Sequence, residues 1–392
     1  MRGESHVAQA PGAPFRDFLL YFLRLGTFGF GGPIALAGHM QRDLVEQRQW
    51  ISKEDYVEGL AFSQLSPGPL AAQLAMYLGW VRAGRWGATA TGIVFILPSF
   101  LMVLALAALY VHFGSLSWIQ GVFYGIGAAV IAIIIRSAVK LVTMTIGHDW
   151  LLWAMFAAVG ITTAWTESEF VLLFILCGII AMAVQSPPAF FGSRLRAAWL
   201  PGADWLVSGL HGPVAGGTLL ALFLFFAKAG AFVFGSGLAI VPFLYGGVVR
   251  DFHWLNERQF LDAVAVAMIT PGPVVITAGF VGYLVAGVVG GVLATVAVFA
   301  PPFVIVIAGA PFYHRFAKNP HVKAFVQGVT AAAVGAISGA AIVLGRRALI
   351  DIPTVLIALT VVTILFVTKR IPEPILILAA GAAGVLLYRG KM

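Results

Sequence analysis

Two proline-glycine-proline motifs interrupt apolar segments of this sequence and are the first candidates for chemistry. Each proline removes a backbone donor and clashes with the preceding turn, so a helix cannot run through either motif. The carbonyl groups that such a break releases need partners, or they face a permeating ion. A plain helix kink is the alternative. The motif residues and the polar side chains near them are Gln64, Ser66, Pro67, Gly68, Pro69, Gln73, Thr270, Pro271, Gly272, Pro273 and Thr277.

A glycine-rich run precedes each of these motifs. It reads Gly29-Phe30-Gly31-Gly32-Pro33 before the first and Phe234-Gly235-Ser236-Gly237 before the second. An opened helix at membrane depth frees amide N–H groups, and the half-helix that restarts after it presents the positive end of its dipole. We therefore expect an anion site at these runs. Close helix packing through small residues is the alternative.

Two pairs of charged residues accompany the breaks. Arg24 and Lys228 lie at matching positions inside apolar segments, where a cation is costly and usually faces a cavity or a partner. Together they suit a doubly charged oxyanion, although long basic side chains also reach headgroups. Glu58 and Asp262 stand at the start of the two proline-containing segments. A helix start favours acids, so proton exchange or gating is one of two explanations for them.

The matching positions arise from an internal repeat. Residues 22–98 align without a gap on residues 226–302, at a constant offset of 204. The identities fall on unusual residues, since PGP aligns with PGP and Trp50 with Trp254. We predict a first repeat over residues 15–185, a linker over 186–213 and a second repeat over 214–390.

Composition places both repeats in a membrane. Of the 392 residues, 60% are hydrophobic and 10% are charged, and apolar runs of about 20 residues recur along the chain. Backbone in lipid must be helical unless protein or a water-filled cavity covers it. We predict an all-α polytopic membrane protein with about six apolar segments in each repeat. Six full crossings would make the repeats parallel, whereas five crossings and a re-entrant hairpin would invert them, and the distribution of basic residues favours inversion.

Several classes of function are not expected. The net charge of +8 comes mainly from basic residues between apolar runs, which indicates topology signals and lipid contacts rather than nucleic-acid binding. The histidines are scattered, Cys177 is the single cysteine, and no Walker, dinucleotide or catalytic-triad pattern appears. We therefore predict no enzyme, no cofactor and no metal site, and we expect any uphill transport to use the membrane potential or an ion gradient.

These motifs resemble the chromate ion transporter family in its two-domain form. The resemblance rests on the run from Phe28 to Pro33, the Trp50 loop leading to Glu58, and both PGP motifs, and it covers nearly the whole chain. It implies chromate efflux across a bacterial inner membrane, hence chromate resistance, with sulfate as a mimic. The residues it marks are Gly31, Gly32, Pro33, Glu58, Gln64, Pro67, Gly68, Pro69, Gln73, Gly235, Gly237, Asp262, Pro271, Gly272 and Pro273.

Alternatives remain at this point. The family pattern is expected to carry a polar residue where this chain has Leu70, so sulfate or another oxyanion is an alternative substrate. A passive channel and a membrane-embedded enzyme acting on lipid or quinone are further alternatives. A homodimer is open. Substrate is expected near the bilayer midplane between the repeats, held by backbone amides with Arg24 and Lys228.

Overall fold

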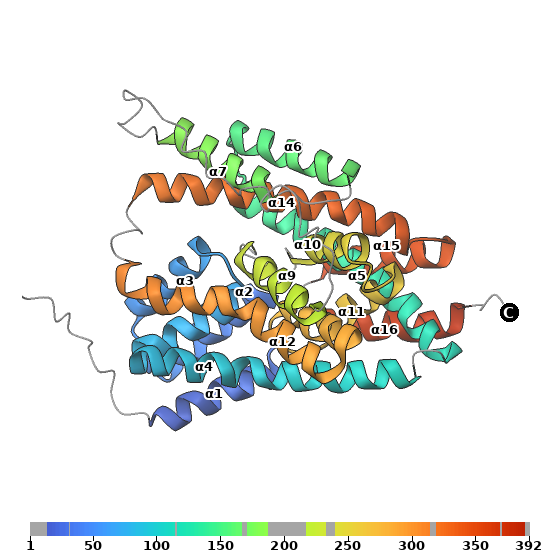
Figure 1. The fold of residues 1–392 in the computed structure, drawn as a ribbon, viewed down its shortest axis with the longest axis horizontal. Helices are drawn as coiled ribbons and strands as arrows, with labels where there is room; N and C mark the ends of the chain where they lie inside the picture. Colours follow the sequence, from blue (N-terminus) through green and yellow to red (C-terminus); the bar gives the residue numbers. More distant parts are fainter. Residues whose placement is uncertain are drawn as a thin grey trace, which may run out of the picture.

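The computed structural model describes residues 14–30, 32–113, 116–166, 171–186, 217–232, 240–313, 319–368 and 371–388, and these are helical with short connections (Figure 1). The predicted linker, apart from Ser186, lies outside them. The first repeat contains α1 (Phe15–Phe28), α2 (Gly32–Met40), the π-helix η1 (Gln41–Gln47), α3 (Lys53–Leu65), α4 (Leu70–Phe113), α5 (Ser117–Thr145), α6 (Trp150–Thr166) and α7 (Val171–Gln185). The second contains α9 (Thr218–Phe232), α10 (Ile240–Tyr245), η3 (Gly246–Asp251), α11 (Glu257–Ile269), η4 (Val274–Ile276), α12 (Thr277–Gly309), η5 (Ala310–Phe312), α14 (Pro320–Ala348), α15 (Ile352–Val367) and α16 (Glu373–Leu387).

Helices long and apolar enough to cross a membrane occur in both repeats. Four such segments are found in the described ranges: Leu70–Phe113, Trp118–Thr143, Val274–Phe312 and Pro320–Ala348. Many large apolar side chains on the helices are exposed, including Trp86, Trp165 and Leu386, as expected of a surface that faces lipid. The chain is therefore a multi-pass membrane protein.

Two of the long segments fold back on themselves. In α4, Ala83 and Gly84 leave the helical region, and Gly84 has φ +58°. Met76 packs against Gly92, and Gly79 packs against Thr91. The part of α4 before the break therefore runs antiparallel to the part after it. The same break occurs in α12 at Ala286 and Gly287, where φ is +60°.

The PGP motifs form the tips of helical hairpins. Before the first motif, Glu58 and Phe62 of α3 both contact Tyr77 of α4, through a 3.2 Å hydrogen bond and a ring pair 5.6 Å apart. Gly59 and Tyr77, each nine residues from Gly68, also lie against each other, which is the pattern of an antiparallel pair. We call residues 53–82 the first PGP hairpin and residues 257–285 the second PGP hairpin.

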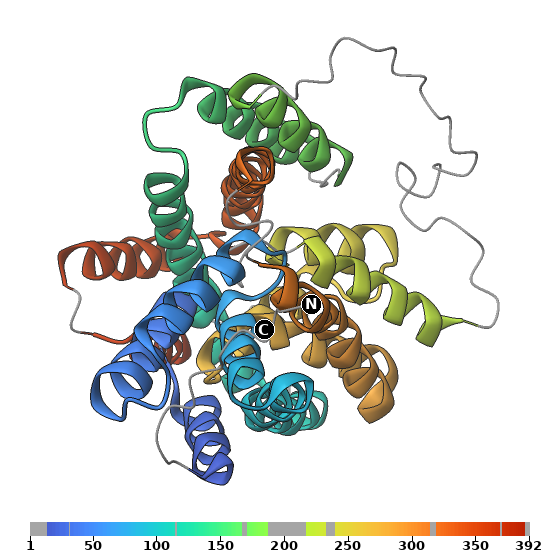
Figure 2. The same cartoon turned by 90° about the vertical axis from the view of Figure 1, so that its left-hand side faces the viewer.

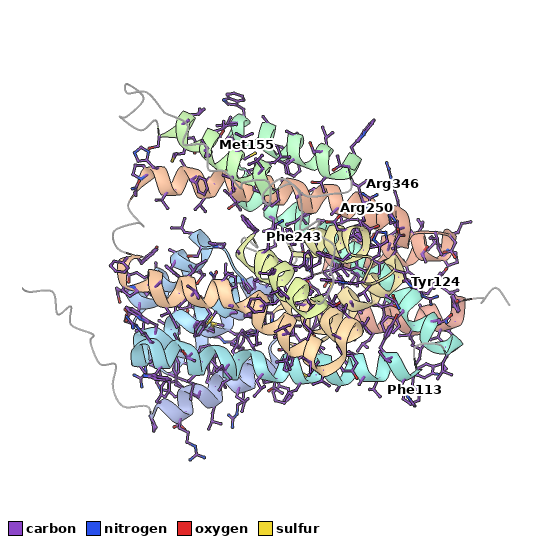
Figure 3. The ribbon with its side chains drawn as sticks, viewed as in Figure 1. Phe113, Tyr124, Met155, Phe243, Arg250 and Arg346 are labelled. Carbon is purple, nitrogen blue, oxygen red and sulfur yellow. The ribbon has the colours of Figure 1, made fainter. Side chains whose placement is uncertain are left out.

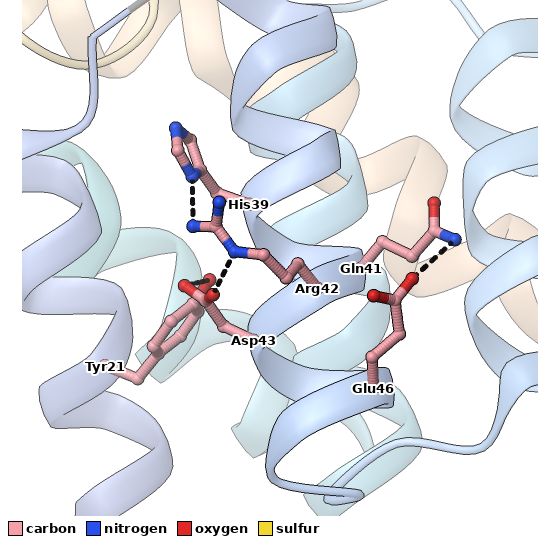
Figure 4. Close-up of polar contacts among 6 residues, drawn as sticks. All are labelled: Tyr21, His39, Gln41, Arg42, Asp43 and Glu46. Atoms are coloured by element: carbon pink, nitrogen blue, oxygen red, sulfur yellow. Dashed lines mark hydrogen bonds and ion pairs between the residues drawn. The ribbon is translucent and has the colours of Figure 1, made fainter.

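A second kind of hairpin has the glycine-rich run at its tip. α1 leads to the glycine-rich run, and α2 and η1 run back beside α1. Near the open end, the Tyr21 hydroxyl donates to Asp43 at 3.3 Å, and Asp43 also accepts from Arg42 (Figure 4). Arg48 lies 5.6 Å over the Tyr21 ring. The first segment therefore folds as a hairpin, as the arrangement with inverted repeats requires, and the PGP segment adds a second hairpin.

The two repeats are interleaved. α14 packs against α6 and α7 of the first repeat, while α5 packs against α15 and α16 of the second (Figures 1 and 2). Gly328 of α14 lies against Cys177, and Gly125 of α5 lies against Ala380. Small residues at these crossings allow close approach of backbones, which is how helices associate in membranes. Each repeat therefore completes its packing only with the other.

The PGP hairpins reach the second part of α4 from opposite ends. The first hairpin covers α4 around Gly92. In the second hairpin, Gly272 lies against Ser99 and Asp262 accepts a hydrogen bond from Tyr110. Phe113, at the end of α4, lies at the same end of the molecule as Tyr124 (Figure 3). The repeats are thus inverted along this helix, as the distribution of basic residues indicated.

Candidate functional site

The hairpin tips meet one another near the middle of the long helices. The Gly272 amide of the second PGP tip donates to the Gly29 carbonyl at the glycine-rich tip of the first repeat, at 3.1 Å. On the other side, a Cβ at Gly68 would lie 2.6 Å from Pro302 of α12. Gly68 and Gly272 have φ of +140° and +99°, conformations that favour glycine. Each PGP tip is therefore seated against the other repeat.

The first PGP tip is closed by Gln73. This side chain is fully buried, and its Nε2 donates to the Pro67 carbonyl at 2.7 Å. Proline rings remove donors in this turn, so a side-chain amide satisfies a carbonyl that the backbone cannot. The Gln73 Oε1 atom has no hydrogen-bond partner among the described residues. Ser66, just before the turn, is buried, and Gln64 is exposed.

The second PGP tip is closed by shorter side chains. The Thr270 hydroxyl donates to the Ala267 carbonyl at 3.0 Å, and the Thr277 hydroxyl donates to Val274 at 2.7 Å. Ser99, from α4 of the first repeat, lies against Gly272 and donates to the Gly26 carbonyl at 3.3 Å. The second tip thus lies against a side chain of the other repeat.

The structure corrects the constant offset of 204 between the repeats. That offset holds through the PGP tips, but beyond them Gly84 corresponds to Gly287 and Ser99 to Pro302, an offset of 203. The second repeat leaves its tip through η4, a 3₁₀ turn, where the first begins an α-helix at once. Three 3₁₀ residues rise about 6 Å, as four α-helical residues do, so one residue fewer spans the same height.

The glycine-rich runs are only partly described. Gly31, Gly235, Ser236 and Gly237 lie outside the described residues. Gly32 has φ +76° and is followed by Pro33 in the first turn of α2, so the helix does restart at this tip. α4 likewise starts directly after Pro69. The positive ends of two half-helices therefore point toward the tips, although α1, α3 and α11 also end there and bring carbonyl groups.

The two cations have different surroundings. Arg24 is exposed on α1. Lys228 is half-buried on α9, with Nζ 5.9 Å over the ring of Phe243 of α10 (Figure 3). A cation over an aromatic face is stabilised when desolvated. Whether either cation binds substrate stays a prediction.

The two acidic residues lie away from the tips, on the outer parts of the PGP hairpins. Glu58 accepts from Tyr77 at 3.2 Å, and Asp262 accepts from Tyr110 at 2.7 Å. Sequence reasoning missed Tyr110 and Ser99 because the residues that they contact in the second PGP hairpin, Asp262 and Gly272, belong to the other repeat. Tyr110 and Tyr313 are 203 residues apart. An alignment of the repeats extended with a one-residue shift would therefore have matched these two tyrosines.

Comparisons with known proteins agree with this architecture. The family model described as chromate transporter matches residues 16–182 and again residues 220–385. A chromate transport protein of Cupriavidus metallidurans is 54% identical over 386 residues, covering 97% of this chain and 95% of the relative. A probable chromate transport protein of Synechococcus elongatus is 51% identical, covering 96% and 97%. A chromate transport protein of Pseudomonas aeruginosa is 30% identical, covering 97% and 94%. No solved structure gives a significant match. With two full-length matches above half identity and both repeats recognised, the chain belongs to the chromate transporter family.

Proposed function

We propose that this protein exports chromate from the bacterial cytoplasm across the inner membrane, driven by the membrane potential or the proton motive force, and so confers chromate resistance. The observation that carries the proposal is the meeting of broken-helix tips from two inverted repeats. Such tips supply helix starts and free backbone groups at the depth where inverted-repeat transporters bind substrate. The identity of the transported anion is taken from the relatives, which are named as chromate transport proteins.

The site chemistry agrees with a small dianion. The restarts of α2 and α4 direct positive dipole ends to the tips, and Arg24 and Lys228 belong to the segments that lead to them. Inverted repeats permit alternating access, because rocking one set of hairpins against the other would open the tips first to one side of the membrane and then to the other. Arg24, Lys228 and the tip residues are proposed to bind the anion.

Uptake into inside-out vesicles tests this function. Labelled chromate is added with and without an imposed membrane potential, and empty vesicles serve as the control. Potential-dependent accumulation is expected. Excess sulfate in a parallel arm ranks the two dianions, and stronger binding of sulfate would make chromate a secondary substrate. If intact protein gives no uptake above empty vesicles, chromate is not the substrate.

A further inference from the structure

A buried carboxyl group in the second PGP hairpin has an unusual environment. Asp262 of α11 is 5% exposed. Its Oδ2 accepts a 2.7 Å hydrogen bond from the hydroxyl of Tyr110, which belongs to α4 of the other repeat. The Tyr110 ring in turn packs edge-on against Phe123 of α5 and Phe280 of α12, with centroids 5.3 and 5.5 Å away. The carboxyl group is therefore buried and bonded to a neutral donor whose ring lies among aromatic side chains.

The first PGP hairpin has a related but different arrangement. Glu58 occupies the position that corresponds to Asp262, and Tyr313, which corresponds to Tyr110, packs on Phe62 with ring centroids 5.5 Å apart. Glu58 also accepts a hydrogen bond from the Tyr77 hydroxyl and is only half-buried. The residue that corresponds to Tyr77 is Phe280, which has no hydroxyl. Asp262 is thus the more deeply buried acid and lacks the Tyr77-type donor.

The charged groups on the elements around Asp262 are mostly engaged elsewhere. Glu257, at the start of α11, pairs with Arg347 of α14 and accepts from Tyr245 of α10. On the faces of α5 and α16, Arg136 pairs with Glu373 at 3.2 Å.

Two further cations lie nearby. In η3, Arg250 donates to the Thr166 carbonyl at 2.7 Å. Arg258, one turn before Asp262 on α11, is exposed. An exposed cation is screened by solvent and compensates a buried anion weakly.

Burying a carboxylate beside a neutral partner is costly, and a group in that position relieves the cost by taking up a proton. The cost disappears when water reaches the group. Because Tyr110 and Asp262 belong to different repeats, any movement of the second PGP hairpin away from α4 both breaks the hydrogen bond and admits water. Protonation of Asp262 is thereby linked to the relative position of the repeats.

Resting on the proposed transport function, we infer that Asp262 is the proton site of this transporter. It holds a proton while the second PGP hairpin packs against Tyr110, and it releases the proton to water when the hairpin moves away. Tyr110 is a positioning residue that seats the carboxyl group. The proton gradient thus acts on the same hairpin whose tip meets the glycine-rich run.

Infrared spectroscopy of the purified protein tests the inference without chromate. A protonated-carboxyl band that titrates with pH is expected in the wild type and should be lost in Asp262→Asn. Asp17→Asn, which alters an exposed aspartate of α1, is the matched control and should keep the band. In Tyr110→Phe, the carboxylate loses a donor, so the band should persist to higher pH; this variant also serves if Asp262→Asn does not fold. A wild-type band that survives in Asp262→Asn, with Tyr110→Phe titrating as the wild type, overturns the inference.

Proteoliposomes then separate the two proposals. In Asp262→Asn, chromate exchange without a gradient should remain, while stimulation by an imposed pH gradient should be lost. Stimulation equal to the wild type would remove Asp262 from coupling even if chromate moves. Conversely, no chromate movement in the wild type, together with an Asp262-dependent infrared band, would reject chromate as substrate and leave the proton site standing.

Discussion

The two PGP hairpins share a motif, a turn and a pair of positive-φ glycines, yet their tips are completed in different ways. The first tip is closed from within, because Gln73 of the same hairpin bonds the Pro67 carbonyl. The second tip has hydrogen bonds of its own from Thr270 and Thr277, and its Gly272 amide also donates to the Gly29 carbonyl of the other repeat. The Gln73 bond should therefore remain when the repeats move apart, whereas the Gly272 bond should break.

The comparison extends to the acidic residues. Glu58 has a tyrosine donor inside its own hairpin, and Asp262 has its donor only across the repeat boundary. Both tips rest on the other repeat, so the hairpins differ mainly in the donors of their acids. Duplication supplied two equal hairpins, and substitutions such as Tyr77 against Phe280 made one of them the more sensitive to its neighbour.

Neutralising the cations is the largest expected effect. The double variant Arg24→Gln with Lys228→Gln should lower transport by about a hundredfold or more, since each charge-assisted contact is worth about 1.5–3 kcal/mol. The protein should still fold, because Arg24 is exposed and Lys228 is half-buried. Vesicle uptake and size-exclusion chromatography measure both. Arg16→Gln, exposed on the same helix, is the control. The two single variants show whether the repeats contribute equally, and normal flux in the double variant would exclude both cations from the site.

Adding a methyl group at the second tip should have the next largest effect. Gly272→Ala forces a side chain into a left-handed conformation, at about 1–2 kcal/mol, and drives Cβ into Ser99, at about 1–3 kcal/mol. Thermal stability and transport should both fall. Ser99→Ala should restore part of the loss by removing the hydroxyl group.

The control combines Ser99→Ala with a glycine-to-alanine substitution at the first tip. Gly68→Ala meets Gln73 and Pro302, so Ser99→Ala should not rescue it. Equal rescue of both glycine variants would mean that Ser99 is not the specific obstacle at Gly272, and the proposed difference between the tips would fail.

Removing the side-chain hydrogen bonds at the tips should have the smallest effects on stability, and the loss should differ between the two hairpins. Gln73→Met orphans the Pro67 carbonyl in a buried turn, for about 1–3 kcal/mol of lost stability. Thr277→Val removes a bond to Val274, whose carbonyl keeps the Thr277 backbone amide as a partner, so the loss should be below about 1 kcal/mol. Thermal unfolding in detergent measures both variants. A larger loss for Thr277→Val would reverse the comparison.

The sequence predicted the architecture in detail where local rules govern it. The last two apolar segments of the second repeat are the helices Ile352–Val367 and Glu373–Leu387. Ser52 and Asn256, 204 residues apart, cap the helices that lead to the PGP tips. The PGP breaks were also predictable, since two prolines around a glycine end a helix wherever they occur. Whether such a break kinks a span or reverses it was not decided by the motif.

The sequence by itself determined that helices must break at the glycine and PGP motifs, because those rules depend on the backbone of a few consecutive residues. The tertiary structure alone decided the register beyond the tips. Paired glycines at 290–291 and paired prolines at 301–302 fit an offset of 203 or 204, and the matches of Thr91 with Thr295 and Phe95 with Phe299 favoured 204. The tertiary structure also decided the partners of Asp262 and Gly272. Those partners lie in the other repeat, and no local propensity encodes which distant helix will bury a given side chain.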